Sequence, residues 1–363
     1  WSPVKSSGLL NIVFQQIGTM HTSMHDLNPK RILLIRPSAL GDVCRSVPVV
    51  ASLHKRWPEA TIDWLVQKGF EDAISAHPNV DNTILFDREQ MRSWYTPKGF
   101  FAILSFLRVL KAKKYDLVLD AQGLGRSGLF TWATRAQSRI GAKNAREFAW
   151  LGYNERVDIQ STHTVDCMLE LAQFAGAEIL PDMQLYVQKK DAEWWDEYRV
   201  DQLLHEKYMV LAPTSRWKSK QWPIEYFAKI AEVAKEKGIG VVVVGAPAEA
   251  SQVETLTMHE GVLNLLPELT IGRLMAVVSR AAIVVANDSA ALHMAVGFNR
   301  PIVALYGPTN PATVGPYLQE SSVISASVSY DEVHYRSSSI GDSIMRTIEV
   351  DQVAKRVHEV LDS

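Results

Sequence analysis

Short apolar runs alternate with longer stretches of helical periodicity along most of the chain. Strands that alternate with helices across short turns are typical of βαβ units and parallel sheets. The pattern therefore predicts an α/β protein. The apolar, β-branched runs predict strands at 31–36, 61–66, 83–86, 116–120, 208–212, 240–245, 282–286 and 302–306. Apolar residues at helical spacing predict helices that include 43–56, 99–114, 123–135, 164–175, 223–238, 247–259 and 289–297.

The alternation is interrupted between Pro181 and Lys207, where we place a domain boundary. Residues 190–206 are polar and helix-prone, and Tyr208–Ala212 begins a second series of strands. A chain of 363 residues is long enough for about two domains with separate cores. The last residues form an amphipathic pattern that is expected to pack as a helix on one of the two domains. The expected divisions are a disordered leader, an N-terminal domain, a C-terminal domain and this final helix, at residues 1–29, 30–189, 190–345 and 346–363.

The distribution of charge narrows the range of partners. A net charge of −2 argues against general nucleic-acid binding. Between Arg88 and Arg146, however, twelve Lys and Arg residues stand against three acids, so this stretch carries +9 and the rest of the chain −11. A solvated helix face explains most single charges, but an asymmetry on this scale predicts an acidic ligand or an anionic membrane surface.

Several classes of protein are excluded by what the chain lacks. Cys44 and Cys167 are far apart and have no metal-ligand spacing, so neither a disulfide framework nor a zinc site is expected. No apolar run reaches the ~20 residues of a membrane span, and a reducing cytoplasm is the expected location. Asp-x-Asp, His-Glu-x-x-His and paired Cys-x-x-Cys motifs are also missing. We therefore expect neither a metal ion nor another cofactor.

Two strand-to-helix turns, one in each predicted domain, carry the most informative polar residues. Ser38-Ala-Leu-Gly41-Asp42 follows the first predicted strand, and Asn287-Asp288-Ser289, with His293 one turn later, follows another. Ligands of open α/β sheets gather at the carboxyl ends of strands, where helix N-termini offer free N–H groups. The two turns predict two facing sites, one for an anionic nucleotide and one for the molecule that reacts with it.

Asp42 has two interpretations. A carboxylate that follows glycine at the start of a helix is often only an N-cap. At the edge of a parallel sheet it is also placed to act as a general base that takes a proton from an attacking hydroxyl. A nearby helix N-terminus would keep the carboxylate ionised and lower its basicity. The residues alone leave both interpretations open.

Further polar residues follow strand ends in the second half of the chain. Thr214, Ser215 and Lys220 offer two hydroxyl donors and a compact positive charge, which suit a diphosphate, although a solvated basic loop is the alternative. Glu249 can accept two hydrogen bonds from a ribose diol, although such a residue taken alone is more often an acid in the first turn of a helix. His293 taken alone is more often a structural histidine.

One glycine-rich stretch matches a different kind of site. Gly123-Leu-Gly125-Arg-Ser-Gly128 has the spacing of the dinucleotide-binding fingerprint and precedes a predicted helix. That fingerprint normally follows the first strand of a domain, with an acid about 20 residues later. Here α/β structure precedes the glycines, and Lys143 follows the next apolar stretch. An NADP-dependent oxidoreductase is therefore a weak alternative.

Six blocks occur in a fixed order across residues 31–317. They are Arg31-Ile-Leu-Leu-Ile-Arg-Pro-Ser-Ala-Leu-Gly-Asp42, Asp120-Ala-Gln-Gly123, Lys220-Gln-Trp-Pro223, Gly245-Ala-Pro-Ala-Glu249, Asp288-Ser-Ala-Ala-Leu-His293 and Tyr306-Gly-Pro-Thr-Asn-Pro311. Together they resemble glycosyltransferase family nine, the heptosyltransferases of bacterial lipopolysaccharide assembly. The second block most resembles the members that add the first heptose to the inner-core Kdo sugar. Each block is modest by itself, but six in order are specific and cover most of the chain.

The resemblance implies a GT-B fold, in which two Rossmann-like domains face each other across a cleft and the C-terminal helix crosses back to the N-terminal domain. It implies an inverting transfer, without a metal ion, of heptose or a similar sugar from a nucleotide-diphosphate donor, expected to be ADP-heptose. The implied acceptor is an acidic lipid-linked glycan of the lipopolysaccharide core. The implied location is the cytoplasm, with peripheral attachment to the anionic inner face of the inner membrane.

The resemblance also assigns roles to residues by position. Asp42 is the implied general base. The implied donor-binding residues are Thr214, Ser215, Lys220, Glu249, Leu269, Asp288, Ser289, Ala290 and His293. The expected acceptor-binding residues are Ser38, Gly41, Gln122, Arg126 and Arg146. Ala290 departs from the family, which usually has glycine there, and a methyl group can crowd the approach to phosphate or sugar. This departure bears on the identity of the sugar more than on the reaction.

Two other functions are compatible with a two-domain fold of this kind. A sugar-nucleotide epimerase needs no acceptor surface, so the basic stretch argues against it. A catalytically silent binding protein would tolerate the loss of Asp42 or Lys220, and both residues are present.

Overall fold

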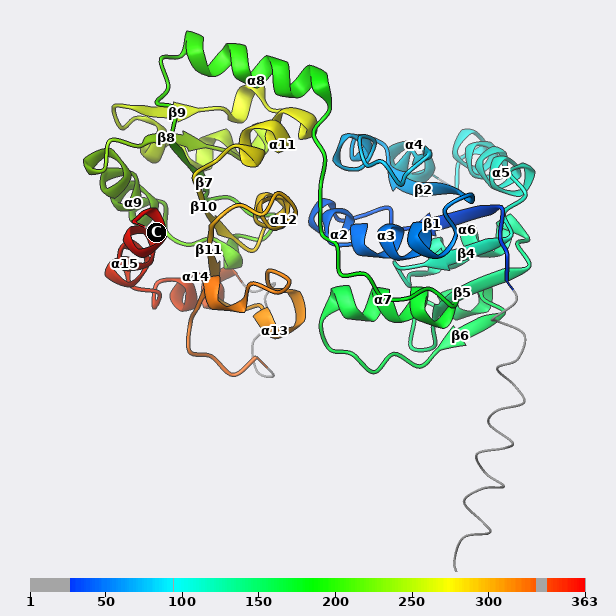
Figure 1. Cartoon of the computed structure of the whole chain (residues 1–363). Coiled ribbons are helices and arrows are strands. Elements are labelled where there is room, and N and C mark those ends of the chain that lie inside the picture. The colour runs from blue at the N-terminus through cyan, green and yellow to red at the C-terminus, as the bar shows by residue number, and fades with distance from the viewer. Residues whose placement is uncertain (1–26, 94, 331–337, 363) are drawn as a thin grey trace, which may run out of the picture.

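Two parallel six-stranded sheets form the framework of the protein (Figure 1). The computed structural model describes residues 27–93, 95–330 and 338–362. Part of the predicted leader, residues 1–26, lies outside the described residues. The first described residue, Leu27, is tied to the N-terminal domain because its carbonyl accepts a hydrogen bond of 3.0 Å from the indole of Trp57.

The first sheet has the strand order β3-β2-β1-β4-β5-β6. Its strands are β1 (Arg31–Ile35), β2 (Thr61–Gln67), β3 (Asn82–Phe86), β4 (Leu117–Asp120), β5 (Ser138–Ala142) and β6 (Glu155–Val157). The two central strands, β1 and β4, are covered on both faces, which is why they read as continuous apolar runs. Because all strands are parallel, the polar turns that follow them meet at one edge of the sheet.

Helices cover both faces of the first sheet. One face is covered by α3 (Val47–Arg56) and α7 (Thr164–Phe174), which pack against each other. The other carries α4 (Arg88–Arg92), α5 (Pro97–Ala112) and α6 (Gly125–Thr134). The single helix predicted over 43–56 is wrong in detail. A short helix, α2 (Leu40–Cys44), ends before α3, and Pro48 lies in the first turn of α3, where its missing N–H leaves no bond unmade.

The second sheet repeats this architecture with the strand order β12-β11-β10-β7-β8-β9. Its strands are β7 (Tyr208–Ala212), β8 (Gly240–Val243), β9 (Val262–Asn264), β10 (Ile283–Asn287), β11 (Ile302–Tyr306) and β12 (Val323–Ser325). All eight predicted strands are confirmed within one or two residues at each end. Sequence reading missed β5, β6, β9 and β12, which are three to five residues long and lie at or next to sheet edges, where an apolar run is not required.

The remaining elements surround the second sheet. The α-helices are α8 (Lys189–Asp201), α9 (Ile224–Glu236), α10 (Glu254–Thr257), α11 (Ile271–Ser279), α12 (Ala290–Gly297), α13 (Pro311–Val314), α14 (Ser338–Met345) and α15 (Val350–Leu361). The 3₁₀ turns of the chain are η1 (Glu71–Ala73), η2 (Ala149–Gly152), η3 (Lys218–Lys220), η4 (Pro247–Gln252), η5 (Leu266–Glu268) and η6 (Glu320–Ser322). The predicted boundary at residue 190 falls at the start of α8, which packs on α11.

The C-terminal helix stays on the second domain. Val353 and Val357 of α15 are fully buried in a cluster with α9 and the second sheet, and Figure 1 shows α15 beside α9. The prediction that this helix crosses back to the N-terminal domain is therefore wrong. The physical reason is that its narrow apolar stripe is already covered by the face of the second sheet that α9 leaves open.

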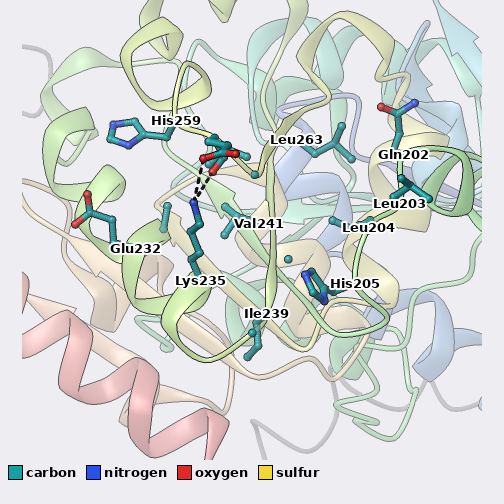
Figure 2. Close-up of a pocket in the computed structure, with 16 residues that line it drawn as sticks. Gln202, Leu203, Leu204, His205, Glu232, Lys235, Ile239, Val241, His259 and Leu263 are labelled. Carbon is teal, nitrogen blue, oxygen red and sulfur yellow. Dashed lines mark hydrogen bonds and ion pairs between the residues drawn. The ribbon is translucent and has the colours of Figure 1, made fainter.

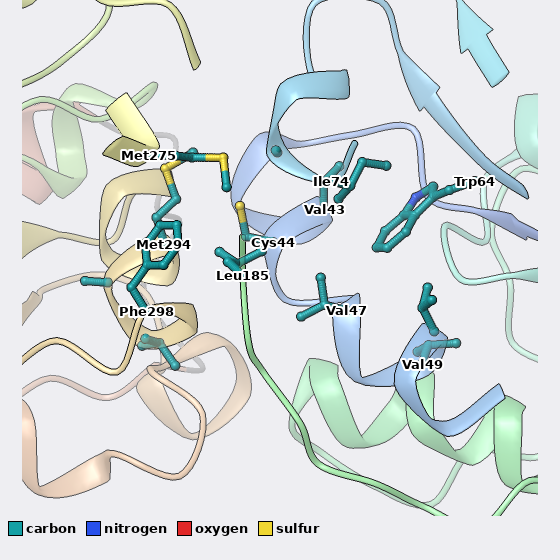
Figure 3. Packing of buried hydrophobic residues seen from close by; sticks show 14 of the residues in the cluster. Val43, Cys44, Val47, Val49, Trp64, Ile74, Leu185, Met275, Met294 and Phe298 are labelled. Atoms are coloured by element: carbon teal, nitrogen blue, oxygen red, sulfur yellow. The ribbon is translucent and has the colours of Figure 1, made fainter. Parts of the chain in front are cut away.

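The two domains meet along a seam between α2 and α12. One apolar cluster runs across this seam, from Trp64 and Val43 of the first domain to Met275 and Met294 of the second (Figure 3). Buried Cys44 belongs to this cluster, which explains its presence without any redox or metal chemistry. The seam brings the turn after β1 and the turn after β10 into contact.

Candidate functional site

Asp42 lies at the domain seam, on the third residue of α2. Its carboxylate reaches back to the N–H of Ala39, at 3.1 Å, so it is not the N-cap residue that the sequence left open as an interpretation. Two guanidinium groups hold the same carboxylate: Arg36 at 3.2 Å and Arg45, one turn further along the chain. The Asp42 side chain remains 25% exposed, so a hydroxyl group can still reach it.

The two arginines determine the ionisation of Asp42. Burial by itself raises the pKa of the carboxyl, but Arg36, Arg45 and the N–H of Ala39 outweigh this effect and lower the pKa to about 2. Asp42 is therefore ionised at neutral pH. A carboxylate with so low a pKa is a weak base towards a resting hydroxyl. It becomes an effective proton acceptor only when the hydroxyl turns strongly acidic as its new bond forms.

Arg45 also connects the two domains. Its second nitrogen donates to the carbonyl of Val314, at 3.1 Å, in the segment around α13. The same segment accepts hydrogen bonds from α7 of the first domain: Thr164 donates to Thr313 at 3.0 Å, and the ring of His163 contacts the carbonyl of Gly315 at 3.2 Å. The arginine that pairs with the carboxylate of Asp42 is thus also hydrogen-bonded to the second domain.

The turn after β4 lies beside the turn after β1. The backbone N–H of Ser38 donates to the side-chain oxygen of Gln122, at 3.3 Å, which brings two expected acceptor-binding residues together. Asp120 shapes this turn because its carboxylate accepts the N–H groups of Gln122 and Gly123, at 2.9 and 3.0 Å. The other oxygen accepts the hydroxyl of Tyr153 at 2.6 Å. Asp120 is fully buried and serves to hold the turn.

Arg126 and Arg146 lie close to this turn on the exposed surface. Arg146 lies directly beside the turn in space, since its backbone N–H donates to the carbonyl of Gly123 at 2.9 Å. The guanidinium of Arg126 lies 5.0 Å from the centre of the Phe86 ring. Burial and the charge of Arg88 lower the pKa of Arg126, which means that an anion placed between these cations would be favoured.

The glycine-rich stretch 123–128 has a structural role. The N–H of Gly125, at the start of α6, donates to the carboxylate of Glu147 at 3.1 Å, where a dinucleotide would place its diphosphate. A side chain at residue 128 would come within 2.4 Å of the carbonyl oxygen of Ala149, so Gly128 lets η2 pack closely on α6. These contacts argue against the NADP-dependent alternative.

Asp288 is the centre of the second-domain half of the site. Its side chain is only 10% exposed, and one oxygen accepts Lys220 at 2.5 Å and the hydroxyl of Thr309 at 3.1 Å. Burial raises the pKa of Asp288, but His293 and Lys220 lower it well below its ordinary range. The buried carboxylate therefore stays charged, and it fixes the position of the Lys220 ammonium group.

The N-terminus of α12 follows Asp288 directly. The Oγ of Ser289 and the Nδ1 of His293 are buried and have no hydrogen-bond partner among the residues that the structure describes, which is unusual for polar atoms in a packed interior. Burial and the charge of Arg45 lower the pKa of His293 to about 4, so the ring is neutral at pH 7. The Nε2 of His293 lies 3.8 Å from the carboxylate of Asp288. Two unpaired polar atoms at a helix N-terminus are suited to contact an anionic ligand.

A third group of residues surrounds Gly245, at the end of β8. A side chain there would meet the hydroxyl of Thr214 at 2.6 Å and the carboxylate of Glu249 at 3.3 Å, so these two polar groups face the same small space. Glu249 also accepts the N–H of Ala246 at 2.9 Å. Leu269 directly follows η5, and η5 packs beside η4, the turn that contains Glu249.

Ser215 joins these groups to Asp288. Its hydroxyl donates to the Asp288 carbonyl at 3.1 Å. Fully buried Asn287 ties the same loops together, since it donates to the carbonyl of Pro213 at 2.6 Å and accepts the N–H of Trp222 at 3.0 Å. The expected donor-binding residues therefore lie in the loops, 3₁₀ turns and helix start that follow β7, β8, β9 and β10, at the carboxyl edge of the second sheet.

The two halves of the site touch through Gly41. A side chain at this position would lie 3.0 Å from His293 and 3.5 Å from the Cα of Ala290. The absence of a side chain at residue 41 is what permits α2 to approach α12 so closely. The expected base and the expected donor-binding residues are thus on opposite sides of one narrow seam.

Sequence reading missed Arg36, Arg45 and Thr309 as functional candidates. Arg36 and Thr309 lie within the six blocks, and Arg45 lies three residues beyond Asp42, at the spacing of helical neighbours. That spacing is the signal that could have identified Arg45. Within residues 27–93, 95–330 and 338–362, no group of three or more acidic, His or Cys side chains could hold a metal ion.

A separate cavity of about 550 Å³ lies at the opposite end of the second sheet (Figure 2). Its walls include His205, Lys235 and His259, which come from the segments that precede β7, β8 and β9. In parallel sheets these segments lie at the edge away from the ligand-binding turns. This cavity is therefore not part of the site formed by Asp42 and Asp288.

Comparison with known proteins identifies the class to which this fold and site belong. The family model "Glycosyltransferase family 9 (heptosyltransferase)" matches residues 103–340. This match covers more than half of the chain, so the protein belongs to glycosyltransferase family 9 and is a glycosyltransferase with the GT-B fold.

Individual relatives agree with this family. The chain is 30% identical to lipopolysaccharide heptosyltransferase 1 of Pseudomonas aeruginosa, over 79% of this chain and 81% of that one. It is 29% identical to the lipopolysaccharide core heptosyltransferase OpsX of Haemophilus influenzae, over 82% and 84% of the two chains. The solved structure of Escherichia coli heptosyltransferase WaaC with ADP superposes with a TM-score of 0.73 and 25% identity, over 91% of this chain and 99% of that one.

Replacement of Asp42 by Asn separates a catalytic role from a purely structural one. We expect Asp42→Asn to lower kcat by about 10²–10⁴, because the amide cannot accept the proton of the attacking hydroxyl. The thermal midpoint Tm and the affinity for ADP are expected to stay near wild type, since Asn fits the same turn and the donor residues lie in the other domain. Steady-state turnover, a thermal melt and calorimetry with ADP provide the comparison. Near-normal turnover would reduce Asp42 to a structural residue.

Replacement of Arg45 tests how the site controls ionisation. Burial raises the pKa of Asp42, and Arg36 and Arg45 lower it to about 2. Arg45→Gln removes one of the two compensating charges, so the pKa of Asp42 should rise. The loss of kcat/KM on acidification, which is expected only near this low pKa in the wild type, should then move to higher pH in the variant. An unchanged pH profile in the variant would show that Arg45 does not set the ionisation of Asp42.

Proposed function

We propose that this protein transfers heptose from ADP-heptose to an acidic, lipid-linked glycan during assembly of the lipopolysaccharide core, with inversion at the anomeric carbon. The relatives named above are lipopolysaccharide heptosyltransferases, and the solved structure of WaaC contains ADP. The observation that carries the proposal is the contact between α2 and α12, which sets Asp42 opposite Lys220, Asp288 and His293.

The donor is proposed to bind the second domain. Lys220 would neutralise charge on the diphosphate, and the hydroxyls of Thr214 and Ser289 would donate hydrogen bonds to it. Glu249 would accept the ribose hydroxyls, and Leu269 would contact the base. The N-terminus of α12 would face the phosphates, where free N–H groups favour negative charge.

The transfer itself needs only one proton acceptor. The acceptor hydroxyl attacks the anomeric carbon, and a new carbon–oxygen bond forms as the bond to the diphosphate breaks on the opposite side. ADP leaves with the electron pair, and the carboxylate of Asp42 takes the hydroxyl proton. Lys220 and the α12 N-terminus stabilise the negative charge that develops on the leaving diphosphate, the task that a metal ion performs in other transferases.

The acceptor is proposed to bind the first domain. Arg126, Arg146 and Gln122 line the turns next to Asp42, and the surrounding stretch 88–146 carries +9. An acidic glycan would be attracted to such a surface. We further propose that the protein works at the anionic inner face of the inner membrane. Among the residues with a described position, no helix has both the length and the apolar character needed to cross a bilayer.

The epimerase alternative is not favoured. The family match and the relatives are transferases, and an epimerase has no use for an acceptor surface. A strong dependence of product formation on an added glycan acceptor distinguishes the two activities.

The donor site can be tested with Lys220. Lys220→Ala should weaken binding of ADP-heptose by about 1–3 kcal/mol, the range for loss of a charge-assisted hydrogen bond. Exposed Lys218 in the same turn supplies a matched control, and Lys218→Ala should leave affinity within experimental error. Calorimetry on both variants gives the answer, and an affinity of Lys220→Ala equal to that of the wild type would remove Lys220 from the site.

Activity should also persist in saturating EDTA, whereas a strict Mg²⁺ requirement would contradict the proposal.

The acceptor site can be tested with the two arginines. Arg126→Ala and Arg146→Ala should each raise KM for the acceptor several-fold, while KM for the donor hardly changes. A several-fold change corresponds to the ~1 kcal/mol that a partly exposed charge pair contributes to binding. The effect should shrink as ionic strength rises, because salt screens the interaction. Lys355→Ala, on the exposed side of α15, is the control for a lost surface charge. An equally good neutral acceptor at all salt concentrations would disprove this assignment.

A further inference from the structure

Helix α5 has an apolar surface that the described part of the protein leaves uncovered. Of its sixteen residues only Gly99 and Leu110 are buried. Phe100 is 51% exposed, Phe101 64% and Val109 46%. A helix on a globular domain normally turns its large apolar side chains towards the core. Here several of them point to solvent, which marks α5 as a contact surface.

The neighbouring elements extend this surface. α5 packs beside α6, where the rings of Phe106 and Phe130 lie 5.1 Å apart, and α6 packs beside η2. On α6, Trp132 is 43% exposed, and Phe148, which directly precedes η2, is 72% exposed. Aromatic residues that are exposed in this way are concentrated here: among the described residues they are Tyr95, Phe100, Phe101, Trp132, Phe148 and, elsewhere, only Tyr186.

The charges on α5 are all of one sign. Residues 97–114 contain five Lys or Arg residues and no acid. Lys113 faces the buried carboxylate of Asp63 at 3.8 Å, whereas Lys98, Arg108, Lys111 and Lys114 are exposed. On α6, the guanidinium of Arg135 lies 3.9 Å from the centre of the Trp132 ring. A basic helix with aromatic side chains is the composition that binds the interface of an anionic bilayer.

The direction of α5 relates this surface to the site. Because α5 connects parallel strands β3 and β4, it runs antiparallel to them, and its N-terminus lies at their carboxyl edge. Phe100 and Phe101 are therefore at the end of the helix nearer to Gln122 and the acceptor-binding turns. Figure 1 shows α5 on the side of the first domain away from the second domain, so a flat surface placed there would leave the C-terminal domain free.

We propose that the exposed side of α5, together with Trp132 of α6, docks the enzyme on an anionic phospholipid bilayer and so presents the acceptor turns to a membrane-embedded glycan. The proposal rests on the function proposed above, because it assumes that the acceptor is lipid-linked. Phe100, Phe101 and Trp132 enter the interface, and Lys98, Arg108 and Lys111 contact lipid phosphates. The absence of acids from α5 favours an anionic bilayer over a protein partner, whose surface carries charges of both signs.

Vesicle binding tests the docking surface directly. The full-length protein should co-sediment with vesicles of phosphatidylcholine and phosphatidylglycerol and bind weakly to phosphatidylcholine alone. Phe100→Ser/Phe101→Ser should lower the partition coefficient at least about tenfold, since two aromatic side chains no longer enter the interface. Arg108→Gln/Lys111→Gln should lower it and reduce its dependence on salt.

A matched control exists on the second domain. Leu203 is 90% exposed and Met258 74%, so Leu203→Ser/Met258→Ser removes as much exposed apolar surface without touching α5. This control should bind vesicles like the wild type. All variants change exposed side chains, and circular dichroism melts should confirm intact folds. Equal vesicle binding by wild type, control and α5 variants would overturn the proposal, as would a wild type that ignores the vesicles and instead forms a dimer that the α5 variants lose.

Activity measurements separate this inference from the proposed function. With a delipidated, water-soluble acceptor glycan, the Phe100→Ser/Phe101→Ser variant, which keeps every charge of the basic stretch, should turn over like the wild type. With the same glycan carried by its lipid in anionic vesicles, the α5 variants should be slower by a factor similar to their loss of binding. If even the wild type fails to transfer heptose to the soluble glycan, the proposed function fails. If transfer to both acceptors is unaffected by the variants, only the docking surface fails.

Discussion

The contact between α2 and α12 is the constraint on which the rest of the site depends. Gly41 lies against the ring of His293 and the backbone of Ala290, so even a single methyl group at residue 41 would press on the second domain. The continuous apolar cluster through Val43 and Met294 stabilises this approach. A proton acceptor on one domain and a donor pocket on the other can cooperate only at such a separation. Bulk at residue 41 would therefore damage catalysis without removing any catalytic group.

Burial at this seam would favour the neutral form of two carboxylic acids, and in both cases nearby cations keep the carboxylate charged. Asp42 is paired with Arg36 and Arg45, and Asp288 is paired with Lys220, so two carboxylates remain charged where desolvation would otherwise protonate them. The arrangements differ in purpose. Around Asp288 the pair fixes the position of the Lys220 cation, which is proposed to bind the donor. Around Asp42 one of the two arginines also bonds the opposite domain, which links ionisation of the base to the relative position of the domains.

Two functions are proposed for the basic first domain, at different distances from the seam. Near the seam, Arg126 and Arg146 border the acceptor turns. Further out, the cations of α5 stand among exposed aromatic residues. Long-range attraction to an anionic surface and short-range recognition of an acidic glycan use the same sign of charge. A single basic stretch between Arg88 and Arg146 can therefore orient the enzyme and bind its substrate.

The sequence by itself determined the α/β architecture, eight of the twelve described strands and the family. Buried parallel strands must be continuous apolar runs, and glycines and acids at their ends are recognisable as turns, so these features are local. The short edge strands β6, β9 and β12 carry no comparable pattern, because an edge strand needs little apolar surface. The position of Asp42 after β1 and of Asp288 after β10 could also be read from local order.

Only the tertiary structure decided what those residues face. No local pattern shows that Gly41 would contact His293, that Arg45 would reach Val314, or that Glu147 would occupy the N-terminus of α6 and remove the dinucleotide interpretation. The amphipathic tail illustrates the same limit, since its stripe predicts a helix but not the surface that it covers. Helical and strand periodicity depends on residues a few positions apart, whereas the pKa of Asp42 and the fit of the seam depend on atoms hundreds of residues apart in the chain.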